Sequence, residues 1–512
     1  MTSPGISSLT AEALAAAFGI EVYDLSDTGA FRYVSERGYL RLPMGETEAG
    51  VGEPDESGAD TVAAALDFDA INALPVLDPD EAVSTTEAIL EELGLLPAKA
   101  TPVGSHTTFD AVGVDGTPVV DAKAIDTTVS YGFKLMKRLL EGPGQKIAVS
   151  YDGDGTVTQL TYDVREFTKA GKVDVVGRKE ALDRCATQLG PAVTVTDATK
   201  AYAAPPLTDA LDALYLSYRC EGTTADGADT RAVFVSALAE GGGPPAPDKP
   251  RAVERREAAP PNSPDTGFQI DAGTSWIGLS QGLGGSEQNT AGFINRMAGA
   301  GVPIQFDYGD ENAWETDWKD PLLGGEDHIV TDDVDLTFYT GHANADGFTA
   351  GGDHDDDFVG YWDALWGNTD MEWASIAACG PLQVGEPGSL WYERWGPSFD
   401  GLHQINGYAT GSYDNTIEGD RFASYLLGSP FWFWEAPMPV HVAWATMARD
   451  SQPRGVEWAS MGVYNIDGFS TFGEHFWDRG WTGPDLRGVL NSPDDPQAST
   501  RKAGYWRISG WT

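Results

Sequence analysis

Short runs of apolar residues recur through the second half of the chain. Residues 275–279, 303–306, 336–339 and 373–379 have the length of strands, and SEQNTAGFINRMAGAG (286–301) has helical spacing and ends at glycine. Strands that are apolar on both faces and alternate with helices are typical of parallel pairing. We therefore expect a doubly wound α/β domain, with a mainly parallel sheet and flanking helices, whose functional groups follow the carboxyl ends of the strands.

The first half has a different, α+β pattern. Ser84-Thr85-Thr86-Glu87 is a capping-box sequence that predicts a helix from there through Leu93, closed by Gly94. Residues 146–151 and 156–164 alternate as strands around Asp-Gly-Asp-Gly, which predicts a hairpin. A further helix is expected in KEALDRCATQL (179–189), with another strand in the segment that ends SYRCEG (217–222).

Composition divides the chain near residue 265. All 16 tryptophans lie at or after Trp276, and residues 237–267 are rich in Pro, Gly and charge without apolar periodicity. We therefore predict an N-terminal region (1–236), a linker (237–267) and a C-terminal α/β domain (268–512) with a Trp-rich extension. The linker is expected to be an exposed tether, and Arg255 and Arg256 are its candidate processing sites.

The formal net charge is −45, and only twelve of the 33 basic residues are lysine. Acidic residues spread along the whole chain are typical of proteins from salt-loving organisms, where salt screens the repulsion. The absence of a basic patch argues against nucleic acid as a partner. Three cysteines make a disulfide framework unlikely.

No stretch of the sequence is long and apolar enough to span a membrane, and the N-terminus does not resemble a signal peptide. The chain as written is therefore expected to be cytoplasmic. Export by a leader that a misplaced start codon hides is left open, and the oligomeric state is not predicted.

Two of the apolar runs end on residues that can do chemistry. One ends at Gly341-His342 and the other at Ala378-Cys379-Gly380. If the two strands are neighbours, thiol and imidazole meet at one edge of the sheet, where histidine can take the proton of the thiol. The small flanking residues leave room for a substrate backbone and for an oxyanion hole made by the amide of Cys379 and an amide near His342.

This order resembles the caspase, legumain and gingipain superfamily of cysteine peptidases, although 37 residues separate the pair here and about 50 separate it in caspases. DLTFYTGHANADGFT, WGNTDMEWASIAACGPL and FDGLHQINGYATGSYD more closely resemble an uncharacterised family of domains thought to share that core, over roughly residues 270–450. The resemblance implies that Cys379 is the nucleophile and His342 the general base. Ala343 replaces the glycine that follows the histidine in many relatives. The amide of Ala343, or another amide, must therefore donate the hydrogen bond to the oxyanion.

Residues 80–235 resemble, more weakly, the propeptide-like domains that precede many secreted peptidases. That resemblance implies a domain that regulates or chaperones the enzyme. The expected partner is a peptide or protein substrate, for which the acidic chain would make an Arg or Lys preference electrostatically easier. No cofactor or metal is predicted.

Several other polar residues are candidates for the pocket. Asn344 and Asp346 lie just beyond His342, and His403 could orient the pair, bind substrate or close a strand. The acidic run GGDHDDDF (351–358) is expected to be a solvated loop rather than a cation site.

Two other functions remain open. Cysteine is often a small buried apolar residue, and a non-catalytic domain could use its tryptophans as a binding or assembly surface. A metal-dependent hydrolase could use the histidines and the acids of residues 353–357, although no metal-ligand spacing supports it.

Overall fold

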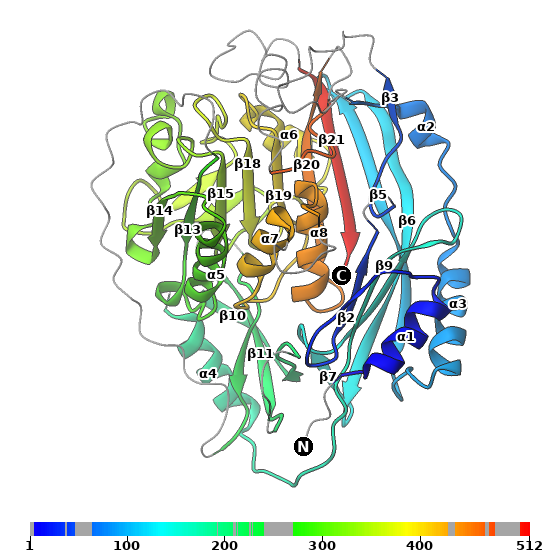
Figure 1. Ribbon diagram of the computed structural model, residues 1–512. Coiled ribbons are helices and arrows are strands. Elements are labelled where there is room, and N and C mark those ends of the chain that lie inside the picture. The colour runs from blue at the N-terminus through cyan, green and yellow to red at the C-terminus, as the bar shows by residue number, and fades with distance from the viewer. Residues whose placement is uncertain are drawn as a thin grey trace.

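The computed structural model describes residues 5–35, 38–46, 64–191, 193–207, 211, 213–224, 227, 229–239, 270–428, 436–465, 470–476 and 502–512. These residues form a mixed α/β structure around one large, mostly antiparallel sheet with few helices (Figure 1). The predicted mixture of helices and strands is confirmed. None of the helices in these ranges has the length and apolar character needed to cross a bilayer.

Five strands of the C-terminal region pair in parallel, in the order β14-β13-β15-β18-β19. They are β13 (Ala272–Trp276), β14 (Ile304–Gly309), β15 (Leu336–Thr340), β18 (Trp373–Ala377) and β19 (Gln404–Tyr408). Every residue of β15 and β18 is buried, as expected for strands that are apolar on both faces. The predicted neighbours β15 and β18 are therefore paired.

The sheet continues beyond β19 with antiparallel strands from both halves of the chain. β20 (Glu457–Asn465) and β21 (Lys502–Trp511) follow, and β21 pairs with β5 (Thr101–Gly113) of the N-terminal region. The sheet as a whole is therefore not a doubly wound parallel sheet, because antiparallel strands from both sides of the predicted linker extend it. The division of the chain at 237–267 stays a prediction.

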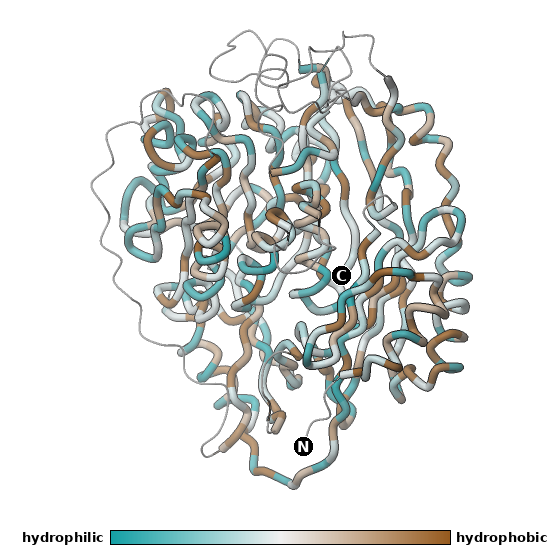
Figure 2. The backbone as a smooth tube through the Cα atoms, viewed as in Figure 1, coloured by the Kyte–Doolittle hydropathy of each residue, from teal (hydrophilic) through white to brown (hydrophobic). Residues whose placement is uncertain are grey.

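Helices cover one face of the parallel strands: α5 (Ser286–Gly299), α7 (Glu418–Leu427) and α8 (Val440–Ser451) lie in front of them in Figure 1. Phe293 of α5 stacks on Phe338 of β15 with ring centroids 5.0 Å apart. The core of the other face contains Trp318, Trp366 and Trp395, the last from α6 (Trp391–Trp395). The outer loops around β14 are mostly hydrophilic (Figure 2).

The remaining N-terminal strands pair mainly antiparallel. They are β1 (Asp24–Leu25), β2 (Phe31–Val34), β3 (Met44–Glu46), β4 (Ala64–Leu66), β6 (Pro118–Leu135), β7 (Arg138–Glu141), β8 (Lys146–Tyr151) and β9 (Val157–Asp163). The hairpin predicted around residues 152–155 is confirmed by the pairing of β8 with β9. Buried residues of α1 (Ser8–Ala17) and α3 (Pro79–Glu92) share a core with these strands. The short helix α2 (Phe68–Asn72) follows β4 and precedes α3 along the chain.

The predicted start of the helix at Ser84 is wrong. α3 begins at Pro79, and the carboxylate of Asp78 accepts hydrogen bonds from the amides of Asp80 and Glu81. Proline at the first helical position has a fixed φ that suits the helix, and Asp78 caps the free amides. The helix therefore begins more than one turn before the capping-box sequence.

A smaller layer in the lower part of Figure 1 comprises α4 (Arg178–Leu189), β10 (Val193–Ala203), β11 (Leu216–Thr224) and β12 (Val233–Ser236), and its strands join the large sheet through the pairing of β10 with β7. A disulfide joins Cys185 of α4 to Cys220 of β11. The cysteine count did not predict this pair, because pairing depends on how closely the fold brings two residues together.

Reduction of this disulfide is expected to destabilise the layer by about 2–4 kcal/mol, since the bond restricts a long loop of the unfolded chain. Thermal unfolding of the wild type with and without a reductant measures the effect. Cys185→Ser with Cys220→Ser is the control: it should unfold at the lower temperature and respond no further to the reductant. Equal unfolding temperatures in all four samples would contradict the prediction.

Candidate active site

His342 and Cys379 follow the carboxyl ends of two paired strands. Thr340 of β15 lies opposite Ala377 of β18, so each candidate residue stands two positions beyond this last pair. Both side chains are buried, with exposed fractions of 0% for His342 and 1% for Cys379. The structure therefore brings the two strand ends to the same edge of the sheet, as the sequence predicted.

The hydrogen bonds of His342 identify its basic nitrogen. Nε2 lies 3.0 Å from the carbonyl oxygen of Gln281, and Nδ1 lies 3.2 Å from the amide nitrogen of Arg231. A carbonyl only accepts and an amide N–H only donates, so Nε2 carries the proton and Nδ1 presents its lone pair. The Gln281 carbonyl thus fixes the ring orientation, and Nδ1 is the atom that can take up a proton.

The thiol of Cys379 is held by Ser412, which lies four residues beyond β19. The amide of Ser412 donates to Sγ at 3.2 Å, and the Ser412 hydroxyl lies 3.6 Å from Sγ. Burial raises the pKa of Cys379, although the hydrogen bonds from Ser412 act to lower it. The protonated thiol is favoured at neutral pH, and a nucleophilic thiolate would need a base and access to substrate.

A segment of the N-terminal region, residues 229–232, crosses directly over the two strand ends. The amide of Asp229 donates to the carbonyl of Ala343 at 2.9 Å, and that of Ala232 donates to the carbonyl of Ser412 at 2.8 Å. Between them the amide of Arg231 donates to Nδ1 of His342. We call residues 229–232 the crossing segment; it connects β11 to β12 and covers the basic nitrogen of the histidine.

The side chain of Arg231 enters a polar pocket beside the strand ends, where it forms a buried ion pair with Glu418 at 2.7 Å. Its two partners at the strand ends are the hydroxyls of Ser412, at 3.1 Å from Nε, and Thr340, at 3.0 Å from Nη1. Both members of the ion pair have 0% exposed side chains. Burial acts to lower the pKa of Arg231, but the carboxylates of Glu418 and Asp414 raise it above its ordinary value.

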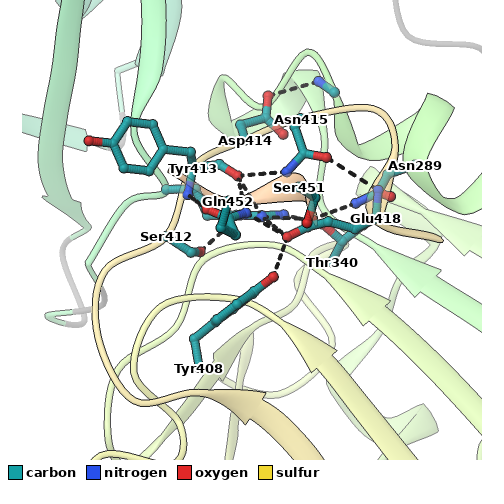
Figure 3. A network of polar contacts seen from close by, with 12 residues as sticks. Asn289, Thr340, Tyr408, Ser412, Tyr413, Asp414, Asn415, Glu418, Ser451 and Gln452 are labelled. Atoms are coloured by element: carbon teal, nitrogen blue, oxygen red, sulfur yellow. Dashed lines mark hydrogen bonds and ion pairs between the residues drawn. The ribbon is translucent and has the colours of Figure 1, made fainter. Parts of the chain in front are cut away.

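Three neighbours hold Glu418 in place from three different elements (Figure 3). Asn289 of α5 donates to Oε2 at 2.9 Å, while Tyr408 of β19 and Gln452, just after α8, donate to Oε1 at 2.5 and 2.6 Å. Glu418 is the first residue of α7, where the helix dipole also favours a negative charge. The pocket is therefore built by the C-terminal region and filled by an arginine of the N-terminal region.

The glycine and alanine candidates lie at the same edge. Gly341 and Ala343 flank His342, and Gly380 follows Cys379 with a φ of +74°, which favours glycine. Asn344 has a local role instead: its side-chain oxygen accepts hydrogen bonds from the amides of Asp346 and Gly347. This turn leads into the small hairpin of β16 (Gly347–Thr349) and β17 (Phe358–Gly360).

The structure places His403 away from the site. It precedes β19, and its amide donates to the carbonyl of Glu372 at the start of β18, the end opposite to Cys379. Its Nδ1 lies 2.8 Å from a carboxylate oxygen of the buried Glu474. Of the three roles left open for it, His403 thus has the one of closing a strand, at the amino end of β19, and the structure does not place it in the pocket beside Cys379.

The acidic run 351–358 does not gather histidine and carboxylates into a group. His354 stacks on Trp314 with ring centroids 3.6 Å apart, and Asp355 pairs with Lys319 at 2.6 Å. Within the described ranges, the group of three or more side chains spaced for a metal is Asp271, Asp335 and Asp370, which includes no histidine. The linker residues Arg255 and Arg256 lie outside the described residues.

Sequence reasoning missed Arg231, Ser412 and Glu418, which complete the site. Arg231 stands next to the apolar strand AVFVS (232–236), and an arginine beside a buried strand is a signal for a buried partner. Nothing in the sequence pairs it with Glu418, which is 187 residues away.

Comparisons with known proteins identify a domain but no activity. A family model described as a domain of unknown function (DUF6345) matches residues 273–510, which include His342, Cys379 and Glu418 but not Arg231. No curated protein matches the chain.

Two solved structures show distant similarity. The C-terminal domain of YpeB from Bacillus megaterium has 12% sequence identity and a TM-score of 0.20, over 46% of this chain and 94% of its own. An uncharacterised protein from Eubacterium rectale has 10% identity and a TM-score of 0.24, over 45% of this chain and 79% of its own. Similarities at this level carry no argument about fold or function.

Proposed function

We propose that the chain is a cysteine-peptidase-like hydrolase in which Cys379 is the nucleophile and His342 the general base. The observation that carries the proposal is the pair of strand ends, with Nε2 of His342 bonded to the Gln281 carbonyl and Nδ1 left as the basic atom. Nucleophilic catalysis requires a base that a third group orients and that can reach the thiol, and the register of β15 and β18 places His342 and Cys379 at matching positions. The N-terminal region would regulate this site.

The proposal includes a caspase- or gingipain-like core for the C-terminal region. Its support is the parallel order β14-β13-β15-β18-β19, with α5, α7 and α8 over one face. Both proposed catalytic residues lie just beyond carboxyl ends of central strands, where α/β sheets place their functional groups.

The proposed reaction follows from these residues. The thiol proton of Cys379 passes to Nδ1 of His342, and the sulfur attacks the carbonyl carbon of a peptide bond, forming a C–S bond and an oxyanion. Amides at Cys379 and Ala343 are the proposed oxyanion donors. The C–N bond then breaks as Nδ1 returns the proton to the leaving amine, and water hydrolyses the thioester to free the acid and the thiol.

A non-catalytic module with a Trp-rich surface is the competing function. Its support is the burial of Cys379, at 1% exposed. Against it, eight tryptophans in the described residues are almost fully buried and serve the core: Trp276, Trp318, Trp366, Trp373, Trp395, Trp444, Trp458 and Trp506. The crossing segment also bonds to Ser412, the residue that holds the thiol, and the hydrolase proposal treats this segment as a cover over the site.

The disulfide bears on the proposed location of the chain. Disulfides persist in oxidising compartments and are rare in the cytosol of most organisms, the hyperthermophiles excepted. The Cys185–Cys220 pair therefore favours export over the cytoplasmic location expected from the N-terminal sequence.

Hydrolysis of fluorogenic peptide amides tests the catalytic proposal. The full chain and its Cys379→Ala variant are compared in high salt, each with and without Arg231→Ala, so that a covered site is not mistaken for an inactive one. We expect hydrolysis to disappear with Cys379→Ala and to fall by about 10²–10⁴-fold with His342→Gln, the usual contribution of a general base. Hydrolysis independent of Cys379, or none in either background, would overturn the proposal and favour the non-catalytic module.

A further inference from the structure

Resting on the proposed function, we infer that the pocket around Glu418 selects an arginine side chain of the substrate, and that the crossing segment 229–232 is a built-in inhibitor that fills this pocket with Arg231. The segment belongs to the N-terminal region, whereas the pocket and the two catalytic candidates belong to the C-terminal region. One part of the chain thus presents to the other the side chain that a substrate would present.

The pocket matches a guanidinium group atom by atom. Nε of Arg231 donates to the Ser412 hydroxyl, Nη1 to the Thr340 hydroxyl, and Nη2 to both carboxylate oxygens of Glu418 and to the carbonyl of Tyr413. A planar fork with five N–H donors satisfies these acceptors, whereas a lysine ammonium has only three donors and a different geometry. An apolar or acidic side chain would leave the Glu418 carboxylate buried without a cationic partner.

Glu418 is held independently of Arg231. Its hydrogen bonds from Asn289, Tyr408 and Gln452 come from the C-terminal region and fix the carboxylate toward the strand ends. A recognition group fixed by its neighbours is pre-organised for an incoming ligand, which reduces the ordering cost of binding. The pocket is therefore suited to receive an arginine from another chain once Arg231 leaves.

The main chain of the crossing segment blocks the chemistry at the same time. The Arg231 amide occupies the lone pair of His342 Nδ1, the atom that must accept the thiol proton. The amide of Ala232 donates to the carbonyl of Ser412, whose own amide donates to the sulfur of Cys379. One short stretch thus covers the base and bonds to the residue that holds the nucleophile.

The segment is also part of a connection between strands rather than of a strand. It lies in the connection between the antiparallel strands β11 and β12, and Asp229 is exposed. A cavity of about 430 Å³ runs alongside, lined by Asp229, Thr230, Arg454 and residues 410–413. The cavity thus reaches Thr230 of the crossing segment and Ser412, the residue that holds the sulfur of Cys379.

Ligand binding in a catalytically inert chain tests the pocket alone. The chain with Cys379→Ala and Arg231→Ala is titrated with acetyl-arginine amide, acetyl-lysine amide and acetyl-citrulline amide, and binding is followed by thermal shift and calorimetry. We expect arginine amide to bind at least tenfold more tightly than its neutral isostere citrulline amide, and Glu418→Gln to abolish the difference. Equal binding of all three would overturn the arginine pocket without touching the catalytic proposal, because no chemistry is measured.

Activity with Cys379 intact tests the inhibitor. Arg231→Ala is expected to raise hydrolysis of arginine peptide amides at least tenfold over wild type, with no comparable rise for leucine or aspartate peptides. Arg219→Ala is the matched control, because Arg219 lies on the same hairpin and also contacts Tyr413 but not Glu418. Arg231→Gln replaces the alanine variant if that variant does not fold.

The remaining outcomes separate the two proposals. An equal rise in Arg231→Ala and Arg219→Ala, or no rise in a chain that still hydrolyses peptides through Cys379, would overturn the inhibitor and leave the catalytic pair standing. Arginine-selective binding in a chain that never shows Cys379-dependent hydrolysis would overturn the proposed function, and with it the roles of substrate pocket and inhibitor.

Discussion

Replacing Glu418 by glutamine is expected to lower the free energy of unfolding by about 3–5 kcal/mol, the usual cost of removing one member of a buried ion pair. Both side chains of the Arg231–Glu418 pair are completely buried, so the guanidinium would stay in the interior without a compensating charge. The glutamine side chain has one oxygen that accepts hydrogen bonds, whereas both carboxylate oxygens of Glu418 accept them. Urea denaturation of the full chain measures the effect.

The same helix supplies a matched control. Asp420, two residues further along α7, pairs with Arg296 at 2.7 Å, but their side chains are 41% and 48% exposed. Asp420→Asn is expected to cost at most about 1 kcal/mol, as exposed pairs do. Combining Glu418→Gln with Arg231→Met removes both charges and should recover much of the loss. Equal destabilisation by Glu418→Gln and Asp420→Asn would contradict the prediction that the buried Arg231–Glu418 pair costs more to break than the exposed Arg296–Asp420 pair.

The placement of the proposed catalytic pair at one edge of the sheet was predictable because its signal is local. His342 and Cys379 each end a short run that is apolar on both faces, and such runs become neighbouring parallel strands. The pocket was not predictable, because Arg231 meets Glu418 only after an arginine of one region has crossed the strand ends of another. The same limit applies to His403, because hydrophobic pattern alone does not tell which end of a strand carries the site.

The extent of the sheet was likewise beyond the sequence pattern. The apolar runs of the C-terminal half indicate parallel strands, and those strands formed. What the pattern does not contain is the pairing of β21 with β5, which joins residues about 400 positions apart and makes the whole sheet mostly antiparallel. Strand alternation reports which face is buried, not which strand lies alongside.

Raising the pH from about 4 to 7 at low salt is expected to destabilise the folded chain, because several buried carboxyl groups hold protons that the unfolded chain releases. Burial, together with the carboxylate of Asp335, raises the pKa of Asp271 to about 7. Burial and the carboxylate of Asp320 raise the pKa of Asp327 to about 7, and burial raises that of Asp163 to about 6.

The sign of the effect follows from proton linkage. Between the ordinary carboxyl pKa of 3.8 and the raised folded values, the folded state binds more protons than the unfolded state. The stability from these groups is therefore fully present below about pH 4 and is lost as the pH rises to 7. Asp450 acts in the opposite sense: Arg32 and Arg421 outweigh its burial and lower its pKa, so its contribution is lost at still lower pH. Stability should thus be greatest in mildly acid solution.

Salt and a single substitution distinguish these buried groups from the surface charge. Molar salt shortens the screening length to about 3 Å and should raise the unfolding temperature near pH 7, where the chain carries a net charge of −45, more than near pH 4, which is close to its isoelectric point. It should remove only part of the slope between pH 4 and 7, since the buried groups are screened far less than the surface charge. Asp271→Asn should flatten that slope, whereas the same change at the exposed Asp154 should not. A slope that salt removes and Asp271→Asn leaves unchanged would assign the pH dependence to the surface instead.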